Sequence, residues 1–97
     1  MSAFVIVDTS IRNQEAYEEY KALAGQMIQK YGGSYRARSG ETDVVEDDLW
    51  SPTRMVIVEF PDIKAARLFA YSDDYAPIAE IRHANADCTV VIVDGVD

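Results

Sequence analysis

The residues best suited to chemistry fall into two groups, and the first group lies on expected strands. It consists of Asp8, Glu59 and Arg38, with Arg36 beside Arg38. In a sheet whose third strand lies between the first and the second, these side chains could converge. A carboxylate–guanidinium cluster can bind an anionic or carbonyl substrate, and it can tune a carboxylate to act as a base. Asp8 and Glu59 are therefore catalytic candidates, although the same groups could instead form a structural ion pair at a sheet edge or subunit interface.

The second group combines aromatic rings with guanidinium groups. Tyr75 and Arg82 are seven residues apart, which is two helical turns, so one helix face can carry both unless Pro77 breaks the helix between them. Trp50 and Arg54 flank the start of an expected strand. Aromatic walls with one or two guanidinium groups suit an aromatic or carboxylated ligand. Arg82, Tyr75, Trp50, Arg54 and Arg38 are the expected ligand-binding residues, with Arg82 as the main cation.

Four further side chains allow a structural and a functional interpretation. His83 could be a general acid or base near neutral pH, or an exposed histidine that the C-terminal helix dipole stabilises. Cys88 opens an expected strand without a basic neighbour, which favours a small buried hydrophobic role. Tyr17 and Tyr20 are interpreted as amphipathic packing at the edge of the core, whereas Tyr75 could equally pack there or line a pocket.

Several familiar sites are missing from the sequence. It contains no Gly-rich phosphate loop, no Cys/His zinc spacing and no nucleophile elbow. One histidine and one cysteine cannot supply the ligands of a structural zinc site, and haem through His83 would need a roomy apolar pocket around it. We expect no metal and no cofactor.

Composition restricts the partners and the compartment. The 97 residues suit one domain over residues 1–97, and the net charge is −8, with 17 acidic and 9 basic residues. Nucleic acids and anionic membranes attract clustered basic residues, so neither is an expected partner. The single cysteine excludes an intrachain disulfide, and the apolar opening Ala3–Val7 is too short to span a bilayer. A cytoplasmic protein is expected.

Hydrophobic patterning predicts four strands and two helical regions. Three short β-branched segments are expected to be strands, and a fourth, more polar segment suits a sheet edge. The first helix should begin after the N-cap Asn13 and end at Gly32, with Leu23 and Met27 facing the sheet. The second should begin after the cap Asp62 and place Ile63, Ala66 and Leu68/Phe69 on a core face. Ser72–Asp74 interrupts it before a further turn or short helix from Tyr75 to His83. The expected strands are Phe4–Asp8, Ser34–Ser39 (resuming at Thr42–Val45), Met55–Glu59 and Thr89–Asp94.

This order of elements, βαββαβ with a divided second helix, is the split βαβ pattern of ferredoxin-like α+β folds with a four-stranded antiparallel sheet. Three of the strands are apolar at successive residues, so both faces of the sheet need cover, whereas the helices of such a unit cover only one. A second copy of the chain is the favoured cover, which makes the protein a homodimer through its sheet face. The alternative cover is the acidic segment Glu41–Asp48 and Trp50 folding back.

The ordered motifs along the chain resemble one small bacterial family. The match begins with Ala3–Asp8, Glu15–Tyr20 and Tyr31–Arg38, and it continues through Trp50–Arg54, Glu59–Asp62, Ala65-Ala66, Tyr71–Tyr75 and Ile81-Arg82. The family is catalogued as domain of unknown function thirteen-thirty, within the dimeric α/β-barrel superfamily. The resemblance implies a ferredoxin-like protomer whose sheet packs against a second sheet. The family often has a second glycine where this chain has Ser39-Gly40, so a bulge there is expected to be altered.

The resemblance restricts the function without naming it. The superfamily includes cofactor-free monooxygenases of aromatic polyketides, muconolactone-isomerase-like proteins, haem-dependent enzymes and amino-acid-sensing domains, and fold alone does not choose between them. The first hypothesis is a small-molecule-binding homodimer that is a cofactor-independent oxygenase- or isomerase-type enzyme for an aromatic or carboxylated metabolite. The second is a non-catalytic ligand-sensing or interaction module.

Overall fold

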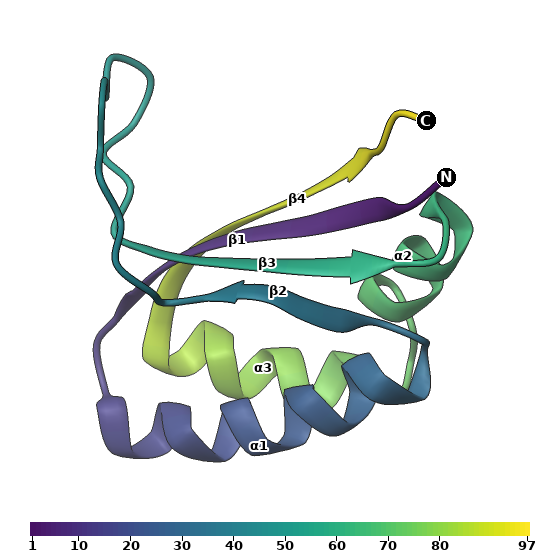
Figure 1. Cartoon of the computed structure of the whole chain (residues 1–97). Coiled ribbons are helices and arrows are strands. Elements are labelled where there is room, and N and C mark those ends of the chain that lie inside the picture. Colours follow the sequence, from purple (N-terminus) through teal and green to yellow (C-terminus); the bar gives the residue numbers. More distant parts are fainter.

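The computed structural model describes residues 1–97 and has the predicted order of elements, with the second helical region divided in two (Figure 1). Neighbouring strands are antiparallel in the order β2-β3-β1-β4, which is the ferredoxin-like arrangement. The prediction of an α+β fold with a four-stranded antiparallel sheet is confirmed. The elements are β1 (Ala3–Ile11), α1 (Gln14–Lys30), β2 (Ser34–Arg38), β3 (Arg54–Phe60), α2 (Ile63–Ala70), α3 (Ala76–Asn85) and β4 (Ala86–Asp94).

Local sequence explains where α1 begins and ends. The Asn13 side chain accepts a hydrogen bond from the Ala16 amide at 3.1 Å, which satisfies one unpaired N–H of the first turn. At the other end Gly32 has a φ of 86°, a conformation that other residues rarely adopt. Gly33 follows, and a methyl group there would lie 2.7 Å from the Phe60 ring, so the chain can approach the core only without a side chain.

The second helical region divides where the sequence predicts it. Asp62 caps α2 through the Ala65 amide at 2.8 Å. Ser72 lies in the interruption, where its hydroxyl accepts a hydrogen bond from the Tyr75 amide at 3.1 Å. Pro77 lies in the first turn of α3, where its missing N–H costs nothing, and α3 continues unbroken to Asn85. Tyr75 and Arg82 therefore belong to one continuous segment.

Three details differ from the sequence predictions. No strand resumes at Thr42–Val45, because the chain between β2 and β3 has no regular structure. Leu68 is 55% exposed, whereas Ala66 and Phe69 are buried on the core face of α2 as predicted. A bulge interrupts the pairing of β2 between Tyr35 and Ala37, where the sequence predicts a regular strand.

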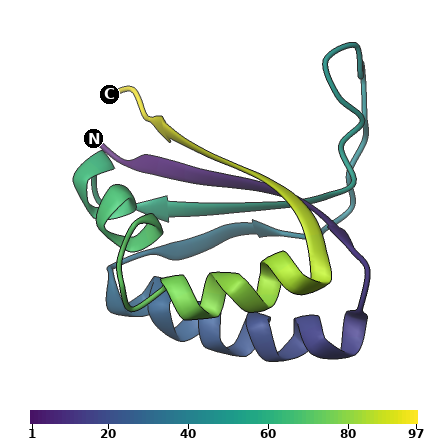
Figure 2. The ribbon, with the colours of Figure 1, turned by 180° about the vertical axis from the view of Figure 1, so that it is seen from behind.

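All helices lie on one side of the sheet (Figures 1 and 2). In β1 the side chains of Ala3, Val5 and Thr9 point to the helices and are buried, as are alternate residues of β3. α1 and α3 run side by side, and α2 packs on the central strands near one end of the sheet. Leu23 and Met27 on α1 are half-buried, so they face the core as predicted but lie at its margin.

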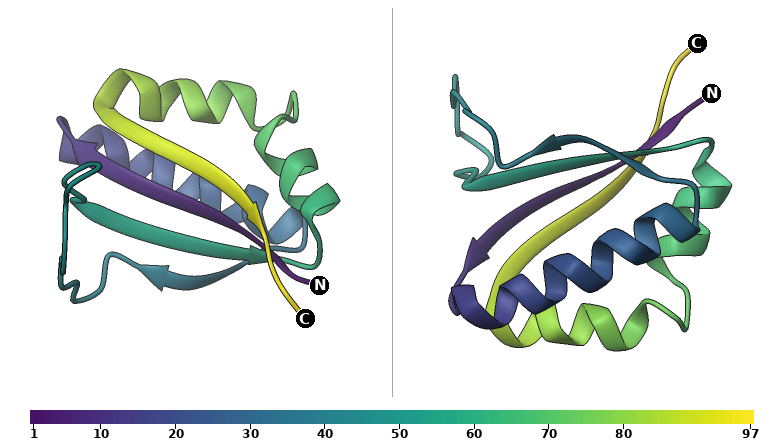
Figure 3. Two further views of the ribbon diagram at one scale, coloured as in Figure 1. Left: turned by 90° about the horizontal axis from the view of Figure 1, so that it is seen from above. Right: turned by 60° about the horizontal axis from the view of Figure 1, so that its bottom comes forward.

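The opposite face of the sheet has no helix over it (Figure 3, left). It carries the other set of alternating side chains, and Val91 and Val93 of β4 are 48% and 43% exposed. We call this the open face and define it by Phe4, Ile6, Asp8, Met55, Ile57, Glu59, Val91 and Val93. The segment 39–53 between β2 and β3 projects from one end of the sheet on this same side. None of the three helices is long and apolar enough to cross a membrane.

Candidate ligand-binding site

A cavity of about 440 Å³ lies between the sheet and the helices. Its walls are inward side chains of all four strands and the facing sides of α1, α2 and α3. Of its 22 lining residues, 16 are hydrophobic. Ligand pockets in proteins run from roughly 300 to 1,000 Å³ and are mostly apolar, so both the size and the lining suit a small organic molecule. Six aromatic rings contribute: Tyr17, Tyr20, Tyr35, Phe69, Tyr71 and Tyr75.

The charge of the cavity is opposite to that of the chain. Five of the nine lysines and arginines line it, whereas none of the 17 aspartates and glutamates does. Of these five, only Lys21 has a carboxylate partner, Glu18 at 3.2 Å. Of the four basic residues elsewhere, three are ion-paired. The unpaired cations are thus concentrated in the cavity, and they are Arg38, Arg54, Arg67 and Arg82.

Arg82 is the most enclosed of these cations. Its residue is only 8% exposed, and no carboxylate pairs with it. Nη1 donates to the Tyr75 hydroxyl at 3.4 Å and Nη2 to the His83 ring at 3.0 Å, while Nε has no partner. Burial acts to lower the pKa of Arg82, but the phenol oxygens of Tyr75 and Tyr20 outweigh it and raise that pKa. A buried guanidinium that keeps its charge without a counter-ion is costly.

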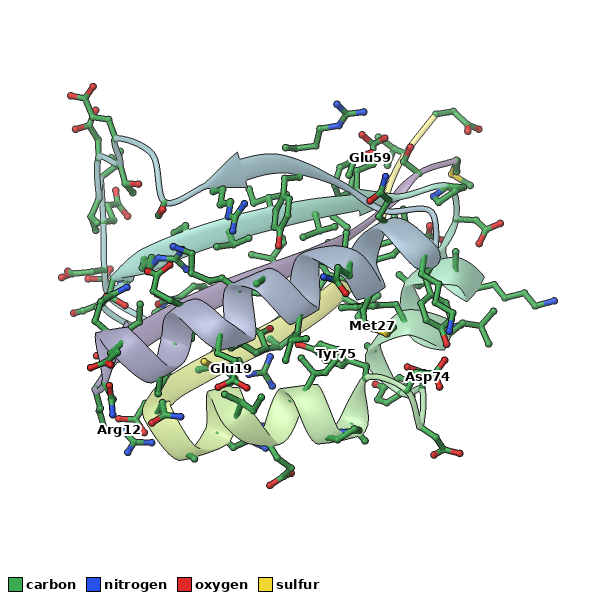
Figure 4. All side chains as sticks on the ribbon, turned by 90° about the horizontal axis from the view of Figure 1, so that it is seen from below. Arg12, Glu19, Met27, Glu59, Asp74 and Tyr75 are labelled. Atoms are coloured by element: carbon green, nitrogen blue, oxygen red, sulfur yellow. The ribbon has the colours of Figure 1, made fainter.

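Two buried tyrosines meet next to Arg82. The hydroxyls of Tyr20 on α1 and Tyr75 before α3 are 2.5 Å apart, and the Arg82 guanidinium lies 5.9 Å from the centre of the Tyr20 ring. Figure 4 shows Tyr75 between α1 and α3 on the helix side of the sheet. Burial raises the pKa of both phenols, so both are neutral at ordinary pH.

Tyr20 is therefore part of the cavity wall and pairs with Tyr75, a role that sequence reasoning missed by treating it as packing. A signal for it was present. Tyr20 lies on the apolar stripe of α1, and a hydroxyl in a buried position needs a hydrogen-bonding partner.

His83 also lines the cavity, and its ring is fixed by two contacts. A guanidinium only donates, so Nε2 accepts from Arg82. Nδ1 then carries the hydrogen and donates a hydrogen bond to the Glu80 carboxylate at 3.1 Å. The lone pair that a general base would use is engaged by Arg82 in this arrangement, so His83 helps to orient the guanidinium.

A β-bulge turns Arg38 into the cavity. Tyr35 lies opposite Val58 and Arg38 opposite Val56, with one extra residue between them, so both side chains face the helices. The Arg38 guanidinium lies 4.5 Å from the centre of the Tyr35 ring. Arg54 on the neighbouring strand is stacked similarly, 5.6 Å from the centre of the Tyr17 ring.

Asp8 and Trp50 lie on the other side of the sheet. The Asp8 carboxylate accepts hydrogen bonds from the Trp50 indole at 3.0 Å, from the Thr53 amide and hydroxyl at 2.9 Å, and from the Arg54 amide at 3.1 Å. Partial burial acts to raise the pKa of Asp8, but these bonds together lower it. The carboxylate anchors the segment 39–53 to β1, and Trp50 cannot stack on a ligand in the cavity.

The expected convergence of Asp8, Glu59 and the β2 arginines is only partly right. Glu59 pairs with Arg36 at 2.7 Å and also accepts a hydrogen bond from Ser2. Asp8 lies opposite Met55, however, and therefore at the other end of β3 from Glu59. Five expected site residues line the cavity, while three lie on the open side of the sheet. The cavity residues are Arg38, Arg54, Tyr75, Arg82 and His83, and the other three are Asp8 and Glu59 on the open face itself and Trp50 beside it, bonded to Asp8.

Two further expectations concern cysteine and metals. Cys88 on β4 is half-buried on the helix side, with its sulfur 3.6 Å from the Thr9 hydroxyl, as a small core residue would be. The structure brings together no group of three histidine, cysteine, aspartate or glutamate side chains suited to a metal ion.

Solved structures share the fold at low sequence identity. A protein of unknown function from Rhodopseudomonas palustris superposes with a TM-score of 0.74 at 16% identity, covering 99% of this chain and 83% of that one. A dimeric ferredoxin-like protein of unknown function from Jannaschia sp. CCS1 gives 0.71 at 14%, covering 98% and 100%. SnoaB, a cofactor-independent oxygenase from Streptomyces nogalater, gives 0.67 at 13%, covering 99% and 94%.

In sequence the evidence is a family match. No curated protein matches the chain. A family model described as "Domain of unknown function (DUF1330)" matches residues 2–96, which is nearly the whole chain and agrees with the motifs that run from β1 to α3. The chain therefore belongs to the DUF1330 family of ferredoxin-like proteins.

Proposed function

We propose that this protein binds a small organic anion with an apolar or aromatic body in the cavity between the sheet and the helices. The observation that carries the proposal is the charge of the cavity: five of nine basic residues and no acidic residue line it, in a chain of net charge −8. Cations that only stabilised the fold would be expected near the abundant carboxylates, as Arg36 is near Glu59. Unpaired cations around an apolar cavity instead suit a negatively charged ligand.

The arrangement of the cations suggests how the ligand is oriented. Arg82 is buried in the cavity wall, whereas Arg38 and Arg67, which also line the cavity, are exposed to solvent. The aromatic lining between them offers ring faces to a planar group. A ligand with an anionic group at Arg82 and an apolar body against the rings matches both features. Arg38 and Arg67 would then attract it from solution.

The tyrosine pair favours an enzyme over a sensor. Two neutral phenols beside a guanidinium can stabilise negative charge that develops on a bound molecule, and they need no cofactor for this. SnoaB, which shares the fold, is a cofactor-independent oxygenase. We infer an oxygenase- or isomerase-type reaction on an aromatic or carboxylated metabolite. A module that senses the same ligand is the alternative, and it would show binding without turnover.

The working unit in this proposal is a homodimer that covers the open face. Phe4, Ile6 and Ile57 are only half-buried there, and Val91 and Val93 are exposed beside them. The two carboxylates of the face, Asp8 and Glu59, have local partners, so a second apolar sheet would meet no unpaired charge. The projecting segment 39–53 flanks the face and does not lie across it. The Jannaschia protein of the same fold is dimeric.

Calorimetric titration with benzoate and with benzamide tests the binding proposal, because the two molecules share shape and differ in charge. Benzoate should bind at least tenfold more tightly than benzamide, and added salt should reduce the difference. The variant Arg54→Gln should weaken benzoate binding and leave benzamide binding unchanged. Equal affinity for the two molecules, or no binding of either, contradicts the proposal. Monitoring oxygen uptake and absorbance with a bound ligand then separates an enzyme from a sensor.

A further inference from the structure

The deep end of the cavity holds hydrogen-bond donors that have no acceptor. Tyr20 and Tyr75 bring two hydroxyl hydrogens, and the 2.5 Å contact between their oxygens uses one of them. No backbone carbonyl, carboxylate or other side chain accepts the second. Arg82 donates a hydrogen bond from Nη1 to the Tyr75 hydroxyl oxygen. That bond uses the acceptor capacity of the Tyr75 oxygen and leaves fewer acceptors for the hydroxyl hydrogens. One phenolic hydrogen is therefore free beside a positive charge.

Arg82 adds to this surplus. Its guanidinium has five N–H groups, of which one goes to Tyr75 and one to His83, and Nε has no partner. Three of its five N–H groups are left without a protein acceptor, so Arg82 supplies charge and further donors while the free phenol supplies one more directed hydrogen bond. The nearest carboxylate, Glu80, is reached only through the His83 ring and does not touch the guanidinium.

We propose that Tyr20, Tyr75 and Arg82 form an oxyanion site, which binds the ionised oxygen of a phenol or enol in preference to its neutral form. This assignment rests on the proposed function and names the group that the deep end of the cavity accepts. A phenolic or enolic oxygen is chemically similar to the tyrosine oxygens, so the three can form one chain of short hydrogen bonds that polarise one another. This series of hydrogen bonds ends at the oxygen atom of the ligand.

The surroundings favour a planar ring on that oxygen. The Tyr17 and Tyr20 rings are 5.1 Å apart, and the Phe69 and Tyr75 rings 4.5 Å apart, so aromatic surface borders the hydroxyl pair on both sides. A ligand that lost its proton here would release it to solvent. Tyr20 and Tyr75 stay protonated because burial raises the pKa of each. The ligand oxygen differs from theirs because it would accept the free phenolic hydrogen in addition to lying beside Arg82. The site would thus make an enolate or phenolate available at neutral pH without a base of its own.

The pKa of bound 4-nitrophenol tests this site, because its ionised form is yellow and its neutral form is not. Titration of the absorbance at saturating protein should give a bound pKa at least one unit below that of free 4-nitrophenol, which is a tenfold preference for the anion. Arg82→Met should abolish the shift. The double variant Tyr20→Phe/Tyr75→Phe should reduce it strongly. Each single variant should reduce it less, because one hydroxyl remains to donate.

Tyr35→Phe is the matched control, since Tyr35 lines the same cavity without contacting Arg82 or the hydroxyl pair. It should leave the bound pKa unchanged. Thermal unfolding of each variant identifies any that does not fold, and the single variants then carry the test. An unshifted pKa of bound 4-nitrophenol, or a shift that survives in the double variant, overturns the oxyanion site while benzoate binding still supports the proposed function. If neither benzoate nor 4-nitrophenol binds, both proposals fail.

Discussion

The polar side chains on the open face of the sheet have hydrogen-bonding partners, whereas several on the helix-covered face do not. On the open face, Asp8 accepts four hydrogen bonds from the segment that enters β3, and Glu59 is matched by Arg36 and Ser2. On the covered face, Arg82 and the Tyr20–Tyr75 pair keep donors without acceptors in a buried position. Solvent could satisfy the exposed groups, whereas an unmatched buried donor costs free energy. The open face therefore has the features of a structural surface, and the covered face those of a binding site.

The largest effect on the dimer is expected at Ile57, in the middle of the open face. Ile57 lies between Ile6 of β1 and Ala37 of β2 in the same sheet. In the proposed dimer, Ile57→Asp would bury an unpaired carboxylate, which costs about 3–5 kcal/mol. The dimer should dissociate at micromolar concentration, and light scattering should give the chain mass of 10.8 kDa instead of twice that value. Val45→Asp, on the exposed part of the segment 39–53, should leave the dimer intact. A monomeric wild-type protein would show that this face is not a subunit interface.

The next effect concerns Arg82 on the covered face. Arg82→Met removes a buried charge and keeps most of the side-chain volume, so the free energy of unfolding should stay unchanged or increase. Benzoate binding should weaken by about 1.5–3 kcal/mol, the scale of a hydrogen bond to a charged group. Chemical denaturation and calorimetric titration measure the two quantities separately.

Lys64→Met is the control for this prediction, because Lys64 is an exposed cation outside the cavity. It should change neither the stability nor the affinity. A large loss of stability in Arg82→Met with unchanged binding would mean that Arg82 is a structural residue. The two faces would then not differ in the way proposed.

The sequence predicted the fold because local rules and the global pattern agree. Asn13 and Asp62 cap the helices as expected, and the β-branched strands pair in the ferredoxin-like order. The doubly apolar strands also indicated that one face would lack cover. Leu68 was misassigned because consecutive residues lie about 100° apart around a helix, so Leu68 faces outward when its neighbour Phe69 faces the core.

The site was predicted less completely, for reasons of register and distance. Asp8 and Glu59 were expected to meet because their strands are neighbours, but antiparallel pairing puts them at opposite ends of β3. The bulge at Arg36 decides that Arg38 faces the cavity, and no sequence rule located it. Tyr20 and Tyr75 are 55 residues apart, so their contact depends on how α1 packs against α3. Residue types could nominate Arg82, but only the fold shows that it lacks a counter-ion.

A moderate effect is expected at Asp8. Asp8→Asn removes the charge that strengthens the hydrogen bonds from Trp50, Thr53 and Arg54, and the loss of stability at neutral pH should be about 1–2 kcal/mol. Because the folded-state pKa of Asp8 is lowered, this stabilisation is complete above the ordinary aspartate pKa of about 3.9 and is lost as the pH falls through the lower folded value. Denaturation curves of both proteins between acidic and neutral pH should therefore converge only in strong acid. A constant difference across that range would show that the charge of Asp8 is not what anchors the segment.

The smallest effect is expected from Arg36→Gln, which removes the partner of Glu59 at the edge of the open face. Hydrogen bonds from Ser2 and Arg36 lower the pKa of Glu59, but the Arg36 side chain is 60% exposed, and water and salt screen such a pair. The thermal unfolding temperature of Arg36→Gln should therefore match that of the wild type. Ser2→Ala, which removes the other donor to Glu59, should also leave the unfolding temperature unchanged. A distinct drop in the unfolding temperature would mean that the pair is shielded from water, and on this face the shield would have to be a second subunit. The Arg36–Glu59 pair thus tests how far the proposed interface extends. A dimer interface confined to the central row around Ile57 leaves Arg36 in solvent. An interface that reaches β2 covers Arg36.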